Sequence, residues 1–233
     1  MRRLRLIQGR VLRSLTSSIG EVAFGMEDGA VSIAGLVFGV AASTNDASIV
    51  LLAGATGAVA GAVSMMAGTY LDVHSERSVA KAQVERLRRR IETDPDEARE
   101  RVVTQLRQSG FTDVEAAAVS AAFVRNPRAM LDHVAAYEVG LPRTSAASPR
   151  AHALWMFFAD LLAASVPVLP FALFDIETAR VVSLVITGAL MAGLGIARGL
   201  IGRESIWRTT LQTMSIAGAA ALAGVLIGRL VTR

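Results

Sequence analysis

Long apolar stretches alternate with short charged segments along most of this chain. Four uncharged stretches lie between the pairs Asp28 and Asp46, Asp46 and Asp72, Arg180 and Arg198, and Arg208 and Arg229. A fifth apolar stretch, 153–174, contains a single charged residue, Asp160. A helix of about 20 apolar residues crosses the hydrocarbon core of a bilayer. The pattern predicts an all-α membrane protein with five transmembrane helices.

The first apolar stretch is short for a membrane span, so we extend its helix back towards Ile19. The extension places Glu21, Glu27 and Asp28 in one half of that helix. Ionisable residues inside a membrane are costly, and they commonly mark ion pathways. Asp160 is a functional candidate for the same reason. The alternative for Asp160 is a carboxyl group that burial keeps neutral and that is hydrogen-bonded to a neighbouring helix.

A long polar segment, 73–151, separates the second span from the third. It holds 13 of the 24 basic and 11 of the 20 acidic residues, so we expect a soluble helical insertion and divide the chain into 1–72, 73–151 and 152–233. Helices are predicted over 75–92, 95–109, 113–124 and 128–139, followed by a linker over 141–150. Asp94 and Pro95 mark one helix start, as an N-cap and a first helical residue.

The distribution of arginine predicts the orientation in the membrane, because short cytosolic segments accumulate Lys and Arg. The first 13 residues contain five arginines, the link 198–208 contains three, and the link 42–47 contains no basic residue. We therefore expect a cytosolic amino terminus and insertion, an external carboxyl terminus, and residence in the inner membrane of a cell. Apolar residues near the amino terminus recur at helical spacing, which favours an interfacial amphipathic helix over a signal peptide.

Composition narrows the possible chemistry. Hydrophobic residues make up 52% of the chain, and the mean hydropathy of +0.46 exceeds that of ordinary soluble domains. The absence of Cys excludes disulfides, Fe–S clusters and thiolate metal sites. The chain also offers no paired His and no nucleophile with an adjacent base. We expect no enzyme activity, no cofactor and no nucleic-acid partner.

Two sequence motifs resemble the first and second helices of the vacuolar iron transporter family. They are Phe24-Gly25-Met26-Glu27-Asp28-Gly29-Ala30-Val31-Ser32 and Ser64-Met65-Met66-Ala67-Gly68-Thr69-Tyr70-Leu71. Segments 95–100 and 137–141 resemble parts of the cytosolic domain of that family, and 166–170 resembles its third-span proline pair. The resemblance follows the whole chain in order and indicates a prokaryote-type member.

The resemblance implies a homodimer in the lipid bilayer with an ion path at the subunit interface. It also implies proton-coupled export of Fe²⁺ or Mn²⁺, which would be substrate rather than cofactor. Asp28 corresponds to the carboxylate of the path and Met65 to the thioether facing it. A polarizable sulfur favours Fe²⁺ over Mg²⁺ or Ca²⁺. We add Glu27, Glu21 and Asp160 to the predicted path, while Met65 alone could equally be a packing residue.

Carboxylates in the insertion are candidates for a second metal site. Glu97 and Glu100 share a helix face and could hold a divalent ion, and Glu138, Glu85 and Glu92 are further candidates. Each has a structural alternative. Glu97 stands where a capping-box carboxylate is expected, and Glu85 could pair with Lys81 one turn earlier. His74, His133 and His152 show no ligand spacing, so we expect them at the surface or in linkers.

The sequence departs from the family pattern at two sites, and a second functional class is open. Thr69 replaces a second-helix glutamate of the family, and Val134-Ala135 replaces a methionine pair. Both changes remove metal ligands and leave the ion open. A membrane scaffold or regulatory protein without transport is the alternative function. Four pairs of small residues predict close helix contacts rather than a pore: Gly35/Gly39, Gly57/Gly61, Gly195/Gly199 and Gly224/Gly228.

Overall fold

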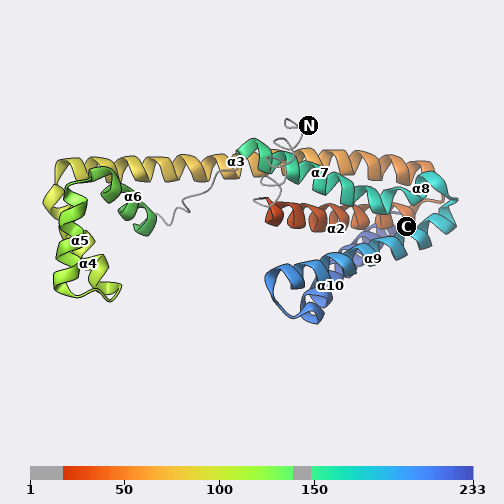
Figure 1. Cartoon of the computed structure of the whole chain (residues 1–233). Coiled ribbons are helices and arrows are strands. Elements are labelled where there is room, and N and C mark those ends of the chain that lie inside the picture. Colours follow the sequence, from red (N-terminus) through yellow and green to blue (C-terminus); the bar gives the residue numbers. More distant parts are fainter. Residues whose placement is uncertain (1–17, 139–147, 233) are drawn as a thin grey trace, which may run out of the picture. The chain divides into compact units, whose positions relative to one another are not determined.

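The structure is a computed structural model that describes residues 18–138 and 148–232. Its helices are α2 (Ile19–Ser43), α3 (Ala47–Thr93), α4 (Pro95–Gln108), α5 (Asp113–Val124), α6 (Pro127–Glu138), α7 (Pro149–Val168), α8 (Pro170–Leu173), α9 (Ile176–Gly202) and α10 (Ile206–Val231) (Figure 1). No strand occurs in these two ranges, and the all-α prediction is confirmed. The predicted amino-terminal helix, and the predicted linker up to residue 147, lie outside the described residues.

Among the described residues, five helices are long and apolar enough to cross a membrane: α2, α3, α7, α9 and α10. Their most apolar windows have mean hydropathies between 1.4 and 1.9. The first span begins at Ile19, as predicted. The chain is therefore a multi-pass helical membrane protein, with five candidate spans in the ranges that the structure covers.

The chain forms two compact units, one of residues 1–71 with 147–233 and one of residues 72–146. We call them the membrane unit and the inserted unit. Helix α3 runs through both, so the predicted separate helix over 75–92 is wrong. Residues 69–93 contain no Gly or Pro and many strong helix formers, and nothing in this stretch ends the helix where the chain turns polar.

Spans of the membrane unit that follow one another in the sequence alternate in direction. Residue numbers in α2 and in its partners α7 and α10 increase in the same direction along each contact. Gly25 faces Met156 and Gly29 faces Asp160 of α7, while Gly35 faces Ala220 and Gly39 faces Gly224 of α10. These three helices are therefore parallel. Helix α9 is antiparallel to α10, because Gly195 faces Thr210 and Gly199 faces Ile206. A chain that crosses a membrane five times requires this alternation.

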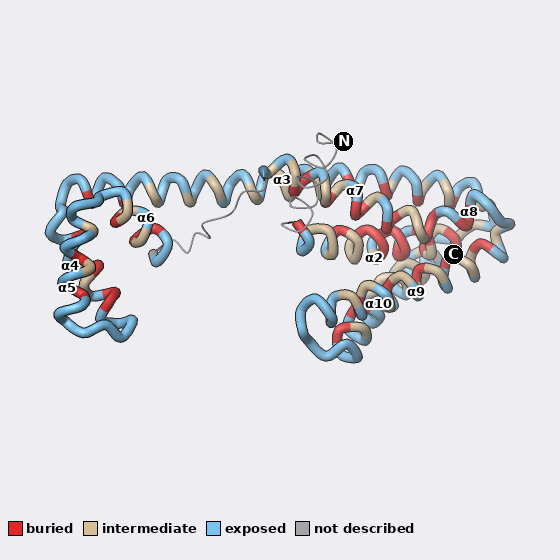
Figure 2. Tube along the Cα trace, in the orientation of Figure 1, coloured by how far each residue is buried: buried red, intermediate tan, exposed pale blue. Residues whose placement is uncertain are grey.

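Helix α2 packs against α7, α9 and α10. Nine of its residues are buried, visible as the red stretches of α2 in Figure 2. Its apolar side forms a core with α3, α7 and α8 through Ile33, Val37, Val50 and Val168. The acidic candidates Glu21, Glu27 and Asp28 thus stand on the helix that the other spans surround.

The third span begins earlier than predicted. Ser148 caps α7 by accepting the Ala151 amide, and Pro149 occupies the first turn, so the predicted linker over 149–150 is wrong. Near its other end α7 contains Pro167 and ends at Val168, and α8 begins at Pro170 after a single residue. The hydroxyl of Ser183 on α9 donates to the Pro167 carbonyl over 2.7 Å.

The inserted unit is built like a small soluble domain. Its core contains Leu87 and Ile91 of α3, Val102 of α4, and Met130 and Val134 of α6. Val134 and Ala135, which replace the methionine pair of the family pattern, are buried in this core.

Helix caps confirm the predicted starts in the inserted unit. The Asp94 side chain accepts the Glu97 amide over 2.9 Å, and Pro95 follows it. Helix α5 begins with a capping box between Thr112 and Glu115. The backbone N–H and the hydroxyl of Thr112 both donate to the Glu115 carboxylate, which lowers the pKa of Glu115.

Candidate functional site

Asp28 lies on α2 at the edge of a small pocket. The pocket has a volume of about 170 Å³ and lies between α2 and α10; its lining is Phe24, Glu27, Asp28, Val31, Thr213 and Ile216. Asp28 is half-buried, and within the described residues its carboxylate has no hydrogen-bond or ion-pair partner. An acidic group in an apolar span without a partner is costly as an anion, so it binds a proton or a cation readily.

Glu27, the neighbour of Asp28, is held by two other helices. Its carboxylate accepts a hydrogen bond from Thr213 on α10 over 3.1 Å. It also accepts one from the guanidinium of Arg198 on α9 over 3.4 Å. Glu27 therefore ties α2 to α9 and α10 and forms part of the pocket wall, whereas Asp28 remains available.

Asp160 reaches the same level of the membrane unit from α7. Its residue surface is only 2% exposed. A Cβ added to Gly29 would collide with the backbone carbonyl of Asp160 and would lie 2.7 Å from its Oδ1. Its Oδ2 lies 3.9 Å from the Cβ position of Gly61 on α3. The absence of a side chain at Gly29 admits this carboxylate beside α2, whereas a Cβ at Gly61 would make only an ordinary van der Waals contact with it.

The two unpaired carboxylates are neighbours. Asp28 directly precedes Gly29, which contacts the backbone and the carboxylate of Asp160. No hydrogen bond or ion pair to Asp160 occurs in the ranges that the structure covers, so the predicted alternative of a carboxyl bonded to a neighbouring helix has no support there. With Glu27 in the wall of the same pocket, the structure thus brings together three of the five predicted path residues.

Met65 stands on the same face of α3 as Gly61, one helical turn further along, because residues four apart in a helix share a face. Gly61 faces Asp160, and Met65 itself is half-buried. Thr69 follows after another turn and is also half-buried. No described contact joins the Met65 sulfur to Asp28, so its role in the path stays a prediction.

Glu21 belongs to a separate polar cluster that the sequence interpretation missed. Its carboxylate lies 2.8 Å from Nδ1 of His152 on α7, and the Ser18 hydroxyl lies 3.4 Å from the same nitrogen. His152 is buried, with 9% of its surface exposed. The prediction of a surface or linker position for His152 is wrong, because α7 already begins at Pro149 and its first turn packs on α2.

A spacing signal could have revealed His152. The residues His152, Met156 and Asp160 follow one another at intervals of four, so they share one face of α7. All three are buried. A row of imidazole, thioether and carboxylate side chains at helical spacing indicates a helix face that packs on another helix. His133 was also expected at the surface, but it is half-buried on α6 and its ring stacks on Phe123 with centroids 5.0 Å apart.

Carboxylates of the inserted unit lie in solvent beside arginines of their own helix. Glu97 pairs with Arg101 at 2.6 Å, Glu92 with Arg88 at 2.9 Å, and Glu85 with Arg89 at 3.3 Å. The suggested Lys81 partner for Glu85 is thus wrong. Glu100 is exposed, and Glu138 is the last residue of α6. Among the residues described, no group of three His, Asp or Glu side chains could hold a metal ion, and metal binding in this unit stays a prediction.

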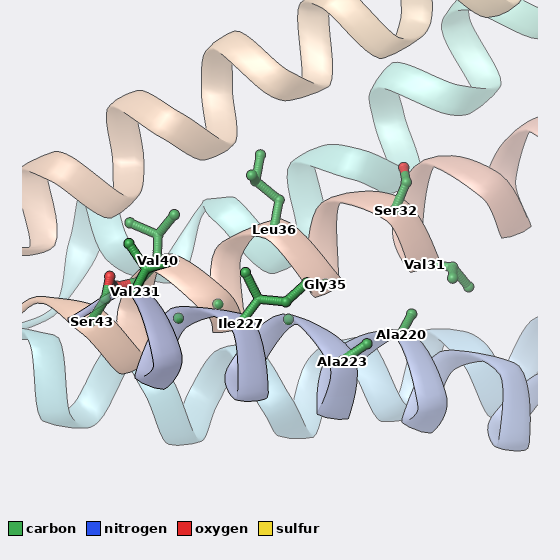
Figure 3. Close-up of a pocket in the computed structure, with 13 residues that line it drawn as sticks. Val31, Ser32, Gly35, Leu36, Val40, Ser43, Ala220, Ala223, Ile227 and Val231 are labelled. Atoms are coloured by element: carbon green, nitrogen blue, oxygen red, sulfur yellow. Dashed lines mark hydrogen bonds between the residues drawn. The ribbon is translucent and has the colours of Figure 1, made fainter. Parts of the chain in front are cut away.

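The glycine pairs make the close helix contacts that their spacing predicts. A Cβ on Gly224 would collide with the Gly35 carbonyl, and one on Gly228 would collide with the Gly39 carbonyl. Beside this contact runs an apolar groove of about 560 Å³ between α2 and α10. Figure 3 shows Leu36 and Val40 on one side of it and Ile227 and Val231 on the other. Val31 lines both this groove and the Asp28 pocket.

Comparison with known families agrees with this arrangement. The model of the VIT family matches residues 19–229, which include every span and the inserted unit. This chain belongs to the VIT family. The resemblance seen in the first two spans is confirmed, and both motifs lie inside the matched range.

Several plant proteins are similar over most of their length. The chain is 29% identical over 208 residues to a vacuolar iron transporter of Centaurea cyanus, covering 88% of this chain and 84% of the relative. It is 28% identical over 214 residues to vacuolar iron transporter 1 of Arabidopsis thaliana, covering 91% and 86%. It is 30% identical over 207 residues to vacuolar iron transporter 1 of Eucalyptus grandis, covering 88% and 83%.

Proposed function

We propose that this protein transports divalent metal ions, Fe²⁺ or Mn²⁺, across a membrane, exporting them from the cytosol in exchange for protons. Family membership and the names of the iron-transporting relatives support metal ion transport. The observation that carries the proposal is Asp28, a carboxylate in a membrane span that faces a pocket without a partner in the described chain.

The chemistry of this position suits exchange. A carboxylate in a low-dielectric span needs a compensating positive charge, which a metal ion or a proton can supply. Occupation by one therefore favours release of the other. Asp160 adds a second negative charge at the same level, which favours divalent over monovalent cations. A thioether from Met65 would favour borderline metals such as Fe²⁺ over Mg²⁺ and Ca²⁺.

We propose a homodimer for the transporting form. The Asp28 pocket and the apolar groove share Val31, so one open face of α2 and α10 carries both. A second copy on this face would exclude lipid from the pocket and enclose an ion path between subunits. This arrangement accounts for a carboxylate that stands at an open edge of a single chain.

The arginine distribution supports a cytosolic amino terminus and inserted unit in the inner membrane of a cell. Reporters fused near Gln108 and after Arg203 should then read cytosolic, and one after Arg233 should read external. A cytosolic signal after Arg233 would contradict the proposed orientation.

Ion flux into proteoliposomes tests the transport proposal. Fe²⁺, Mn²⁺, Zn²⁺ and Ca²⁺ are offered separately, with a pH-sensitive dye reporting proton counterflow. We expect Fe²⁺ and Mn²⁺ to move faster than Ca²⁺ and to drive protons in the opposite direction. A folded dimer without metal-dependent flux would overturn the proposal and favour a scaffold or regulatory role.

A further inference from the structure

Helices α2 and α7 contact each other at three levels, each one helical turn apart; we call this line of contact the α2/α7 seam. The facing residues are Glu21 with His152, Gly25 with Met156, and Gly29 with Asp160. Because the helices are parallel and keep the same spacing, two helical turns connect the first level to the third. The third level holds Asp160 and lies next to Asp28.

The first level is a part-buried acid–base pair, in which His152 is buried and Glu21 is half-buried. An ionised carboxylate can only accept hydrogen bonds, so Nδ1 of His152 donates to Glu21 and Nε2 carries the free lone pair. Binding of a proton at Nε2 makes an imidazolium and turns a neutral hydrogen bond into an ion pair. Imidazole is the side chain whose charge ordinarily changes between about pH 5 and 8.

The charged groups around His152 leave Glu21 as its ionic partner. On α2, Glu27 is bonded to Arg198 of α9 and Thr213 of α10, and Asp28 faces the pocket toward α10. On α7, the nearest charged residue is Arg150, which is exposed. Within the described chain, Glu21 is the only charged group bonded to His152.

We propose that Glu21 and His152 form a proton-binding site that holds the α2/α7 seam closed when His152 is protonated and loosens it when His152 is neutral. Helix α2 carries Asp28, so the pair sets how fast the metal pocket can rearrange. This inference rests on the proposed function for its effect on transport, but not for the proton-dependent contact itself. His152 acts through α2 and is a positioning residue.

Distance measurement tests the contact without transport. The chain contains no Cys, so spin labels attach only at the introduced pair Ile19→Cys and Leu154→Cys, both exposed positions at this end of the seam. We expect a shorter and narrower distance distribution at pH 5.5 than at pH 8, and no pH dependence when His152→Gln is added. Identical distributions at both pH values in the His152 protein would overturn the proposal.

Equilibrium exchange of Mn²⁺ in proteoliposomes, with equal pH on both sides, tests the effect on transport. The measured quantity is the ratio of the exchange rate at pH 5.5 to that at pH 8. We expect this ratio to be roughly tenfold higher in His152→Gln and in Glu21→Gln than in the unaltered protein, because the ion pair that holds α2 and α7 together is lost. The double variant should match either single variant, since the two residues act as one unit.

Restoring the pair with its partners exchanged distinguishes a proton-binding role of Glu21 and His152 from a packing role. The exchanged variant Glu21→His/His152→Glu keeps both partners and should restore the pH dependence. Equal slowing at every pH in the single variants, without rescue, would show a packing role and overturn the proposal. If the unaltered protein moves no metal, the proposed function fails, while the spin-label distances still decide the proton-binding site.

Discussion

Three glutamates of the inserted unit and two aspartates of the membrane unit have opposite surroundings. In the inserted unit, Glu85, Glu92 and Glu97 are exposed and paired with arginines one turn away. In the membrane unit, Asp28 and Asp160 have neither hydrogen-bond nor ion-pair partners among the described residues, and Asp160 is 98% removed from solvent. Exposed pairs contribute little and suit a soluble helix surface. An unpaired carboxylate in a span is retained at a cost in free energy, which indicates a function.

The units also differ in what holds their helices together. The inserted unit buries Leu, Val, Ile and Met side chains among four helices. In the membrane unit, α2 and α10 touch through glycine backbones, since lipid gives little hydrophobic drive for helix association. Small changes of volume should therefore matter more in the membrane unit.

Gly224→Ala should give the largest loss of stability among single-methyl additions, because the new Cβ would collide with the Gly35 carbonyl. We expect a cost of about 1–3 kcal/mol, typical of overpacking, seen as a lower thermal midpoint in detergent. Gly218→Ala on the same helix is the matched control, since its Cβ would meet nothing within 4 Å. Equal thermal midpoints for both variants would contradict the claim that the glycine contact between α2 and α10 does not tolerate added volume.

Asp160→Asn keeps the side-chain volume and removes the charge beside Asp28. We expect metal flux to fall about tenfold, which corresponds to about 1.4 kcal/mol of lost cation stabilisation. The thermal midpoint should hold or rise, because a buried unpaired acid is replaced by a neutral amide. Full flux in this variant would show that Asp160 is a neutral packing residue.

Met65→Leu should change ion preference more than maximal rate. Leucine fills a similar volume without the soft sulfur, so the preference for Fe²⁺ over Ca²⁺ should fall by a few fold. Met66→Leu, next along α3, serves as the control for a general loss of methionine. Competition of the two ions in one flux assay measures the ratio, and an unchanged ratio would leave Met65 as a packing residue.

Glu115→Gln in the inserted unit should have the smallest effect. Hydrogen bonds from Thr112 lower the pKa of Glu115 in the folded state. Its stabilising contribution is therefore present above the ordinary glutamate pKa and is lost as the pH falls through the lowered value. Melting followed by circular dichroism between pH 3 and 7 should show a slightly weaker acid dependence for the variant, and no such change for Asp132→Asn. A change in metal flux would contradict the separation of the units.

Local sequence signals predicted the parts of the fold that local physics controls. The start at Ile19, the Asp94 cap and the glycine contacts follow from hydrophobic length, capping chemistry and small-residue spacing. The continuous helix α3 was missed because charge after Asp72 was read as an end, although charge does not stop a helix without Gly or Pro.

Long-range pairs could not be read from the sequence. His152 and Glu21 are 131 positions apart, so neither residue signals the other, and the parallel packing of α2 and α7 had first to be known. Asp28 was identified through its motif and its place in an apolar span. Its closeness to Asp160 depends on Gly29, whose role emerges only from the packed helices.

Mn²⁺ uptake into proteoliposomes, compared between Asp28→Asn and Glu97→Gln/Glu100→Gln, tests the central claim most directly. Asp28→Asn preserves shape but removes the charge that faces the pocket. The account predicts that this variant folds and assembles normally but transports nothing, while the double variant of the inserted unit retains most of its uptake. Normal uptake by Asp28→Asn, or its loss only in the double variant, would contradict the claim that the membrane carboxylate carries the ion.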